Sequence, residues 1–142
     1  MNDIDAQHLR RAIKLAVAAR GAGQRPYGAL LVGPDGVVLA EDHNTVLADR
    51  DITAHPELKL ARWAAQQLDG PAVRETVMYT SCEPCEMCAG AIARAGIGRV
   101  VFALSDEQWR SLVRSGFEAT SAVYEGPALF DEARVPIDGY DG

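Results

Sequence analysis

Long hydrophobic runs are missing from this chain of 142 residues, although 48% of its residues are hydrophobic. Since a helix needs roughly 20 consecutive apolar residues to cross a bilayer, the sequence predicts no membrane-spanning segment. The first residues, MNDID, lack the basic flank and apolar stretch of a secretory signal peptide. We therefore expect a cytoplasmic protein, with one domain over residues 1–142, because this length suits a single hydrophobic core.

Basic charge is also scarce: 14 Lys and Arg residues stand against 20 Asp and Glu residues, and the formal net charge is -6. A surface that binds nucleic-acid phosphates normally needs clustered Lys and Arg. The acidic balance therefore argues against a polynucleotide partner.

Cysteine is limited to three residues, all within the segment 82–88. Such an odd cluster without distant partners is a poor disulfide framework and predicts a metal site in a reducing compartment. Pro84 disfavours helix just before itself, so a helix could begin near Cys85. Cys85 and Cys88, three residues apart, would then share one face of it.

The other half of the candidate metal site is His55, followed by Pro56 and Glu57. Proline suits the first position of a helix, so His55 would lie at a helix entrance with Glu57 in the first turn. One imidazole and two thiolates suit zinc, and three protein ligands leave the fourth tetrahedral position for water. Glu57 would then move the protons of that water.

A closed structural zinc site is the alternative, because Cys82 extends the pair to C-x-x-C-x-x-C. A structural site gives no reason for Glu57 to stand beside the histidine. We therefore expect Cys82 to be a small buried residue rather than a ligand.

Helical periodicity, turn signals and short apolar runs alternate along the chain. Helix 56–68 would have one apolar face, formed by Leu58, Ala61, Ala65 and Leu68. The order predicts a three-layer α/β/α domain with both metal half-sites at helix N-termini beyond strand ends. From about residue 118 the signals weaken, and residues 122–124 or 129–130 could add short extended pieces. The expected helices are 5–20, 56–68, 86–95 and 106–114, and the expected strands are 27–32, 37–40, 77–79 and 99–103.

Two motifs give the chain a resemblance to the cytidine deaminase-like superfamily, from the first helix through Ala103. TAHPE at 53–57 is similar to the family's T-A-H-A-E, and SCEPCEMC at 81–88 to its S-C-E-P-C-x-M-C. YGA, HN and AGAI at 27–29, 43–44 and 89–92 follow in the expected order. The nearest branches are the bacterial guanine deaminases and the tRNA adenosine deaminases. Ser115-Gly116-Phe117 after Trp109 favours guanine deaminase.

The resemblance implies a central mixed five-stranded sheet, one catalytic Zn²⁺ per chain and hydrolytic release of ammonia from a nucleobase or nucleoside. Glu57 would be the catalytic acid–base group, with His55, Cys85 and Cys88 as metal ligands. It also implies a homodimer, whose partner would complete the pocket. The substrate contacts would come from Asn44, from the backbones of Ala54 and Glu83, and from Tyr27 and Trp109 at the pocket wall.

Departures from the family pattern leave the substrate open. Pro56 replaces the usual alanine, and Ala93-Arg94 replaces an aromatic pair typical of guanine deaminases. Neither the aromatic C-terminal segment of guanine deaminases nor the basic C-terminal helix of tRNA editors is found. Guanine or a related aminopurine is favoured, with cytosine or cytidine, or tRNA adenosine, as the alternatives.

Overall fold

The computed structural model describes residues 1–113 and 120–142. Ser115, Gly116 and Phe117, which favoured guanine deaminase in the sequence, therefore lie outside the described residues. No helix of the described part is long and apolar enough to cross a membrane.

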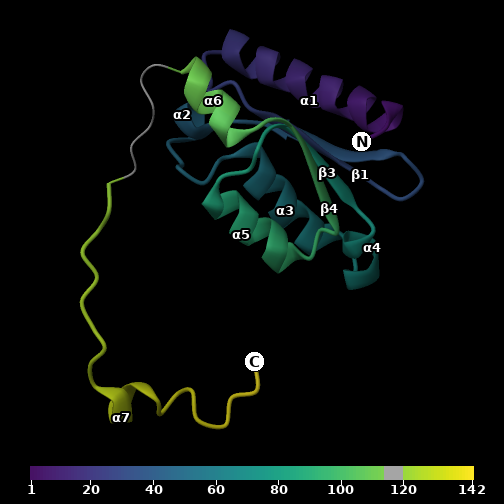
Figure 1. Cartoon of the computed structure of the whole chain (residues 1–142). Coiled ribbons are helices and arrows are strands. Elements are labelled where there is room, and N and C mark those ends of the chain that lie inside the picture. Colours follow the sequence, from purple (N-terminus) through teal and green to yellow (C-terminus); the bar gives the residue numbers. More distant parts are fainter. Residues whose placement is uncertain (114–119) are drawn as a thin grey trace.

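A mixed sheet with the strand order β2-β1-β3-β4 forms the centre of the molecule (Figure 1). Strand β1 pairs antiparallel with both β2 and β3, whereas β3 and β4 are parallel. The G-P-D-G turn joins β1 to β2, and Gly36 takes a φ of 81° that a residue without a Cβ adopts readily. The strands are β1 (Gly28–Val32), β2 (Val38–His43), β3 (Val77–Cys82) and β4 (Arg99–Leu104).

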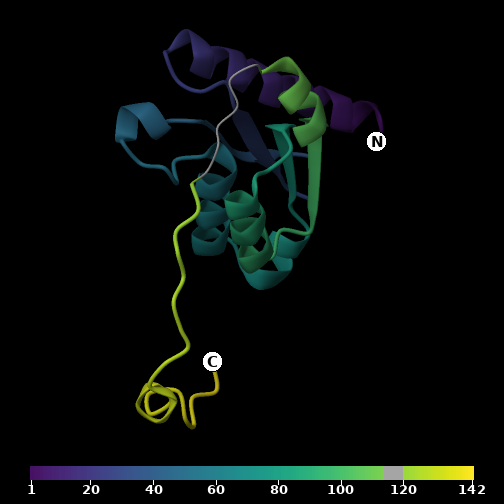
Figure 2. The same ribbon diagram turned by 60° about the vertical axis from the view of Figure 1, so that its left-hand side comes forward.

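The expectation of five strands is wrong for the described residues, which form four. Residues 120–129 have no regular structure, and the short helix α7 (Phe130–Ala133) follows them. This C-terminal tail (residues 120–142) is exposed at every position and extends away from the sheet (Figures 1 and 2). It therefore offers β4 no backbone groups with which to pair.

Helices cover both faces of the sheet and confirm the three-layer α/β/α prediction. Helix α1 (Asp3–Gly21) lies on one face, and α3 (Pro56–Gln67) and α5 (Glu86–Ala95) lie side by side on the other (Figure 2). Helix α6 (Asp106–Leu112) follows β4. The short helices α2 (Val46–Asp49) and α4 (Gly70–Arg74) were not expected. Asp69, directly after the expected helix 56–68, caps the start of α4 by accepting a hydrogen bond from the amide of Ala72.

The two faces of β1 fill two separate cores, because successive side chains of a strand point to opposite sides. Ala29 and Leu31 pack with the α3 and α5 side, whereas Leu30 and Val32 pack with α1. All of β1 is buried. This central strand therefore anchors both helical layers, including the two helices whose first turns carry the candidate site.

The buried face of α3 matches the expected one in part, because Ala61 is in the core and Leu68 packs against it. Leu60, Ala61 and Ala64 are buried in the core, while Leu58 and Ala65 line a groove against α5. The helix is thus turned so that Leu58 packs against its neighbouring helix rather than against the sheet. Glu57 is buried by the same orientation, with 5% of its surface exposed.

Candidate metal centre and active site

His55 stands at the entrance of α3, as its N-cap residue, with Pro56 at the first helical position. Pro56 lacks an amide hydrogen, so no donor is left unpaired there. The carbonyl of His55 accepts the first helical hydrogen bond, from the amide of Lys59. Backbone geometry thus places the half-buried imidazole at the mouth of the helix and Glu57 in its first turn.

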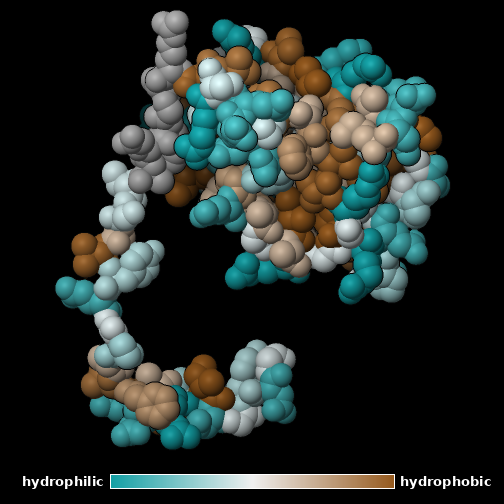
Figure 3. All heavy atoms as spheres, in the orientation of Figure 1, coloured by the Kyte–Doolittle hydropathy of each residue, from teal (hydrophilic) through white to brown (hydrophobic). Residues whose placement is uncertain are grey.

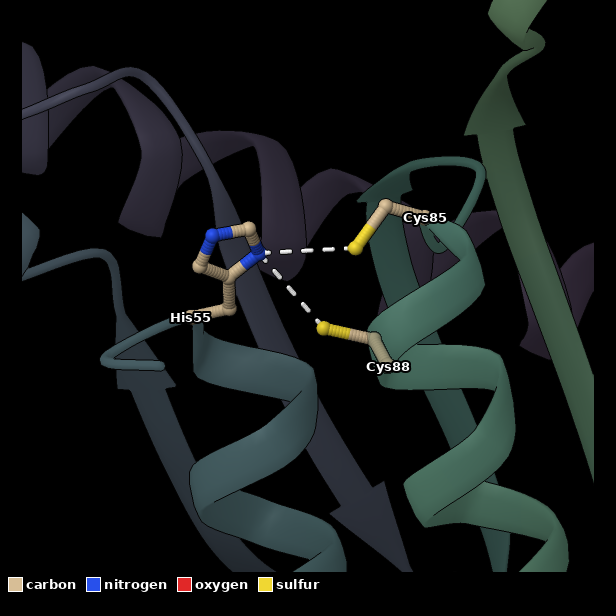
Figure 4. A group of neighbouring side chains, drawn as sticks. All are labelled: His55, Cys85 and Cys88. Carbon is tan, nitrogen blue, oxygen red and sulfur yellow. Dashed lines mark hydrogen bonds between the residues drawn. The ribbon is translucent and has the colours of Figure 1, made fainter. Parts of the chain in front are cut away.

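Cys85 is the N-cap residue of α5, and Cys88 lies in its first turn. Both sulfur atoms face the Nδ1 atom of His55, at 3.7 Å from Cys85 and 3.5 Å from Cys88 (Figure 4). Cys88 is fully buried, whereas Cys85 is exposed. Two helix starts that are 30 residues apart in the chain therefore bring three metal-ligand atoms together.

These distances fit a tetrahedral zinc ion. Bonds of about 2.3 Å to sulfur and 2.0–2.1 Å to nitrogen put the two ligand atoms about 3.5 Å apart at a tetrahedral centre. The three ligand atoms lie within 4.8 Å of one another. The donor set of one nitrogen and two sulfurs also suits zinc better than Mg²⁺ or Ca²⁺, which prefer oxygen.

Cys82 lies outside this group, which within the described residues comprises His55, Cys85 and Cys88 alone. It is half-buried at the end of β3, and burial raises the pKa of its thiol. The closed four-ligand alternative would need Cys82 to join the three ligand atoms. The geometry instead matches a three-ligand arrangement with one position left for water.

The electrostatics of the three side chains favour a thiolate at Cys85. Hydrogen bonds from the Cys88 thiol, and then from the His55 ring, lower the pKa of Cys85 to about 4. The same contact with Cys85, together with burial, raises the pKa of Cys88. The hydrogen bond to Cys85 raises the pKa of His55. A thiolate is the form of cysteine that binds metals.

Glu57 is a buried carboxyl group beside the cluster. The sulfur of Cys88 lies 3.6 Å from the Oε2 atom of Glu57. Burial raises the pKa of Glu57, because a low-dielectric environment disfavours the charged form. A carboxylate with a raised pKa binds a proton more readily and is better suited to accept and return protons near neutral pH.

Asn44 lies at the end of β2 with 1% of its surface exposed. Its backbone amide donates to the carbonyl of Tyr27 at 3.0 Å, and its Oδ1 atom accepts from the amide of Val46 at 3.0 Å. The side-chain carbonyl thus closes the local turn. Its NH₂ group makes no hydrogen bond to any residue within 1–113 or 120–142, so this donor remains for another partner.

Ala54 and Glu83, the two expected backbone contacts to the substrate, lie in the loops that flank the site. The amide of Ala54 donates to Asp51 and its carbonyl accepts from Thr45, so both of its backbone groups already make protein contacts. The Glu83 amide donates to Leu104, and its carboxylate accepts from the amide of Asp106 at the start of α6. Glu83 therefore connects α6 to the cysteine loop, and its backbone carbonyl accepts no hydrogen bond from residues 1–113 or 120–142.

Tyr27 and Trp109 are far apart in the sequence but lie next to each other in the structure. Tyr27 is half-buried, and burial raises the pKa of its phenol, while a hydrogen bond from the Trp109 indole acts in the opposite direction. Cys82 and Glu57 both lie near enough to Tyr27 to raise its pKa electrostatically. Tyr27, expected at the pocket wall, thus lies near Glu57, and Trp109 lies beside Tyr27.

Two apolar grooves lie next to α5 but do not contain the His55 cluster. One of about 300 Å³ runs between α3 and α5, and one of about 430 Å³ lies between α5 and β4. Arg62 and Arg94 border the first groove. The first groove is lined only by leucine, alanine and arginine, and the one acidic side chain at the second, Glu83, stands apart from the three candidate ligands.

Lys59 and Ser81 lie beside the site, but neither was predicted from the sequence as a site residue. The ammonium group of Lys59 contacts the residues around Asn44, and the Ser81 hydroxyl accepts from the amide of Gly28 at 3.1 Å. Lys59 follows Glu57 by one helical half-turn, where a lysine is usually a solvated surface residue. A lysine between two leucines was the one available signal.

Comparisons with known proteins agree with this geometry. Residues 2–104 match the family model of the cytidine and deoxycytidylate deaminase zinc-binding region. The guanine deaminase of Bacillus subtilis is 42% identical over 130 residues, which cover 91% of this chain and 81% of the relative. An X-ray structure of guanine deaminase from that organism has a TM-score of 0.78, at 31% identity, and covers 97% of this chain and 92% of its own.

Two further relatives are named for other substrates. The probable cytosine deaminase of Schizosaccharomyces pombe is 33% identical over 155 residues, covering 99% of this chain and 94% of the relative. The tRNA-specific adenosine deaminase of Haemophilus influenzae is 35% identical over 105 residues, covering 74% of this chain and 61% of the relative. The resemblance seen in the motifs is confirmed: the chain belongs to the cytidine and deoxycytidylate deaminase family and is a hydrolytic deaminase.

Proposed function

We propose that this chain is a zinc-dependent deaminase that releases ammonia from a small nitrogenous heterocycle, with guanine or a related aminopurine as the favoured substrate. The observation that carries the proposal is the group of His55, Cys85 and Cys88 beside the buried carboxyl of Glu57. The similarity to guanine deaminase in sequence and in structure supports the purine.

His55, Cys85 and Cys88 would hold the zinc. When bound, the ion would lower the pKa of a water toward about 7, from roughly 9 for the aqueous ion, so that hydroxide is available at neutral pH. Glu57 would accept a proton from the attacking water and pass it to the ring nitrogen of the substrate. After the C–O bond has formed, Glu57 would take the remaining hydroxyl proton of the adduct and give it to the amine, so that the C=O double bond forms as the C–N bond breaks and ammonia leaves.

Residues around the cluster would recognise the ring. The NH₂ group of Asn44, free of partners in the described part of the chain, can donate to an acceptor on the edge of the base. The backbone carbonyl of Glu83 is a candidate acceptor on the other side. Tyr27 and Trp109 would form the wall against which the ring stacks.

The alternatives keep the same chemistry with other substrates. The S. pombe relative favours cytosine or cytidine, and the H. influenzae relative favours adenosine in tRNA. The net charge of -6 argues against tRNA, because counterion release at phosphates drives such binding. A tRNA-editing enzyme would bind an anticodon stem-loop with steep salt dependence and would leave free bases intact.

An ammonia-release screen of the zinc-loaded protein tests the proposal directly. The panel includes guanine, other aminopurines, cytosine, their nucleosides, and aminated triazines and pterins. Guanine or another aminopurine should release ammonia fastest. Release from cytosine alone would move the assignment to a pyrimidine, and release from no compound at all would refute the enzyme as proposed.

A homodimer is part of the same proposal, and the C-terminal tail supports it. Val123, Tyr124 and Phe130 are exposed by 87, 93 and 71%. Figure 3 shows apolar side chains both on this tail and on the body beside α5 and β4, where the two grooves lie. Burying these surfaces between two copies would remove a large apolar area from water.

Light scattering should give twice the 15.3 kDa of one chain, and a monomer at micromolar concentration would contradict the dimer.

A further inference from the structure

Lys59 uses all three hydrogens of its ammonium group on one short segment. Its Nζ atom donates to Asp42 Oδ1 at 3.0 Å, to the carbonyl of His43 at 2.9 Å and to Thr45 Oγ1 at 2.9 Å. Only 21% of the Lys59 side chain is exposed. A lysine normally keeps its ammonium group in water. Here all three N–H groups donate to protein acceptors, which is unusual for a lysine.

The three acceptors flank Asn44 in the sequence: Asp42 and His43 are the last residues of β2, and Thr45 follows Asn44. We call residues 42–45, the end of β2 and the two residues after it, the Asn44 loop. Two acceptors precede Asn44 and one follows it, while Asn44 itself bonds to Tyr27 and Val46. The Asn44 loop is also joined to the start of α3, because the Thr45 amide donates to the carbonyl of Ala54 at 3.1 Å. Lys59 adds a second connection to α3, one half-turn beyond Glu57.

We infer that Lys59 is a positioning residue for substrate binding: its ammonium group fixes the Asn44 loop to the helix that carries Glu57. The inference rests on the proposed function, because the contact of Asn44 with the base is itself proposed. Lys59 does not touch the substrate. It sets the separation between the amide that would hold the ring and the carboxyl that would move the protons.

The expected effect appears in substrate binding more than in turnover. Asn44 would hold the base in the ground state and in the transition state alike, and losing such an interaction raises KM with little change in kcat. A shift of about 1 Å in a positioning group can cost up to about 100-fold. Replacing Lys59 with methionine, which keeps the apolar stem, should therefore raise KM about 10- to 100-fold.

Three variants separate positioning from general stability. Lys59→Met removes the ammonium group, and Lys59→Arg keeps a charged donor with several N–H groups. Lys14→Met is the matched control, because Lys14 is the only other lysine and is exposed on α1. We expect Lys59→Arg to restore KM to within about threefold of wild type, and Lys14→Met to leave it unchanged. A Lys59→Met enzyme with wild-type KM, or one whose KM the arginine does not restore, would overturn the inference.

Amide hydrogen exchange tests the same inference without catalysis. In the wild type, the Asn44 and Thr45 amides are bonded to Tyr27 and Ala54 and should exchange slowly. Lys59→Met should speed exchange at these two amides while leaving those of β1 protected. Unchanged exchange at both would overturn the inference. If Lys59→Met does not fold, Asp42→Ala and Thr45→Val remove its side-chain acceptors one at a time and should each raise exchange in the Asn44 loop.

The two experiments also keep this inference apart from the proposed function. If the wild type deaminates no compound, the proposed function fails, and hydrogen exchange still decides whether Lys59 holds the loop. If the wild type is active but the Lys59 variants behave like Lys14→Met, the proposed function stands and the role of Lys59 is refuted.

Discussion

The hydroxyl of Tyr79 donates a 2.7 Å hydrogen bond to the carboxylate of Asp5, which joins β3 to the first turn of α1. Arg99 of β4 donates two more hydrogen bonds to the same carboxylate, at 3.0 and 2.8 Å. Asp5 is only 2% exposed, so its charge would be costly to bury without these partners. One acidic side chain thus connects α1 to two neighbouring strands on the face opposite the site.

This arrangement predicts acid sensitivity. The hydrogen bonds from Arg99, and then that from Tyr79, hold the pKa of Asp5 well below its ordinary value of 3.8. The carboxylate form of Asp5 is therefore more favoured in the folded protein than in the unfolded chain. The stabilisation is fully present above about pH 4 and is lost progressively as pH falls below that value. Unfolding measured from pH 7 to pH 2 should show a steeper loss for the wild type than for Asp5→Asn, and parallel curves would contradict it.

The hydroxyl of Tyr79 should itself contribute to stability. A hydrogen bond to a charged acceptor is worth about 1.5–3 kcal/mol, so Tyr79→Phe should lower the free energy of unfolding by roughly that amount. Burial and the bond to Asp5 raise the pKa of Tyr79 to about 12, so this contribution persists to at least pH 10. Denaturant titration at pH 7 measures it. Glu41→Gln, which removes an exposed ion pair with Arg11, is the control and should cost less than about 1 kcal/mol.

Glu57→Gln should separate catalysis from metal binding. The amide has nearly the shape of the carboxyl but cannot shuttle a proton, so kcat should fall by about 10²- to 10⁴-fold. The zinc content, measured by atomic absorption, should stay at one ion per chain, because Glu57 is not among the three ligand atoms. A variant with substantial turnover would show that another group moves the protons.

Exchanging the cysteines one at a time distinguishes an open metal site from a closed one. Cys85→Ser and Cys88→Ser should each lose most of the bound zinc, because each removes one of three ligand atoms. Cys82→Ser should retain one zinc per chain and at least half of the activity. Loss of zinc from the Cys82 variant equal to that from Cys88→Ser would support a four-ligand structural site instead.

Gly28 begins β1 where α1 crosses it, and its lack of a side chain is a packing requirement. A Cβ there would lie 2.5 Å from the carbonyl oxygen of Ala12 and 2.6 Å from the Cβ of Leu15. Gly28→Ala should therefore destabilise the fold by about 1–3 kcal/mol through overpacking. Gly21→Ala, where nothing lies within 4 Å, is the matched control and should not destabilise it. Equal thermal midpoints for the two variants would contradict the close approach.

The sequence predicted the layered fold because its periodic signals and turns are strong. Helix 86–95 matches α5 residue for residue, and the expected helix starts at Pro56 and near Cys85 place the three candidate ligands together. These features depend on local chemistry, namely proline geometry and the spacing of side chains on a helix. They can be found without knowledge of how distant segments pack.

Features set by tertiary packing were not predictable in the same way. Leu58 and Leu60 are chemically alike, and only the orientation of α3 against the sheet decides that Leu60 enters the core. Asp5 looked like a residue of a helix start, since its partners Tyr79 and Arg99 lie far along the chain. That residues 1–142 form one domain stays a prediction, as do the roles of the site residues.

The three candidate ligand atoms come from the starts of two helices whose contact depends on the sheet beneath them. An ion held by all three would leave whenever α3 and α5 part, even if each helix stayed intact. Its rate of release to a strong chelator would then report how often the native packing opens locally. The rate of metal release would thus measure the frequency of local opening between α3 and α5 without any substrate.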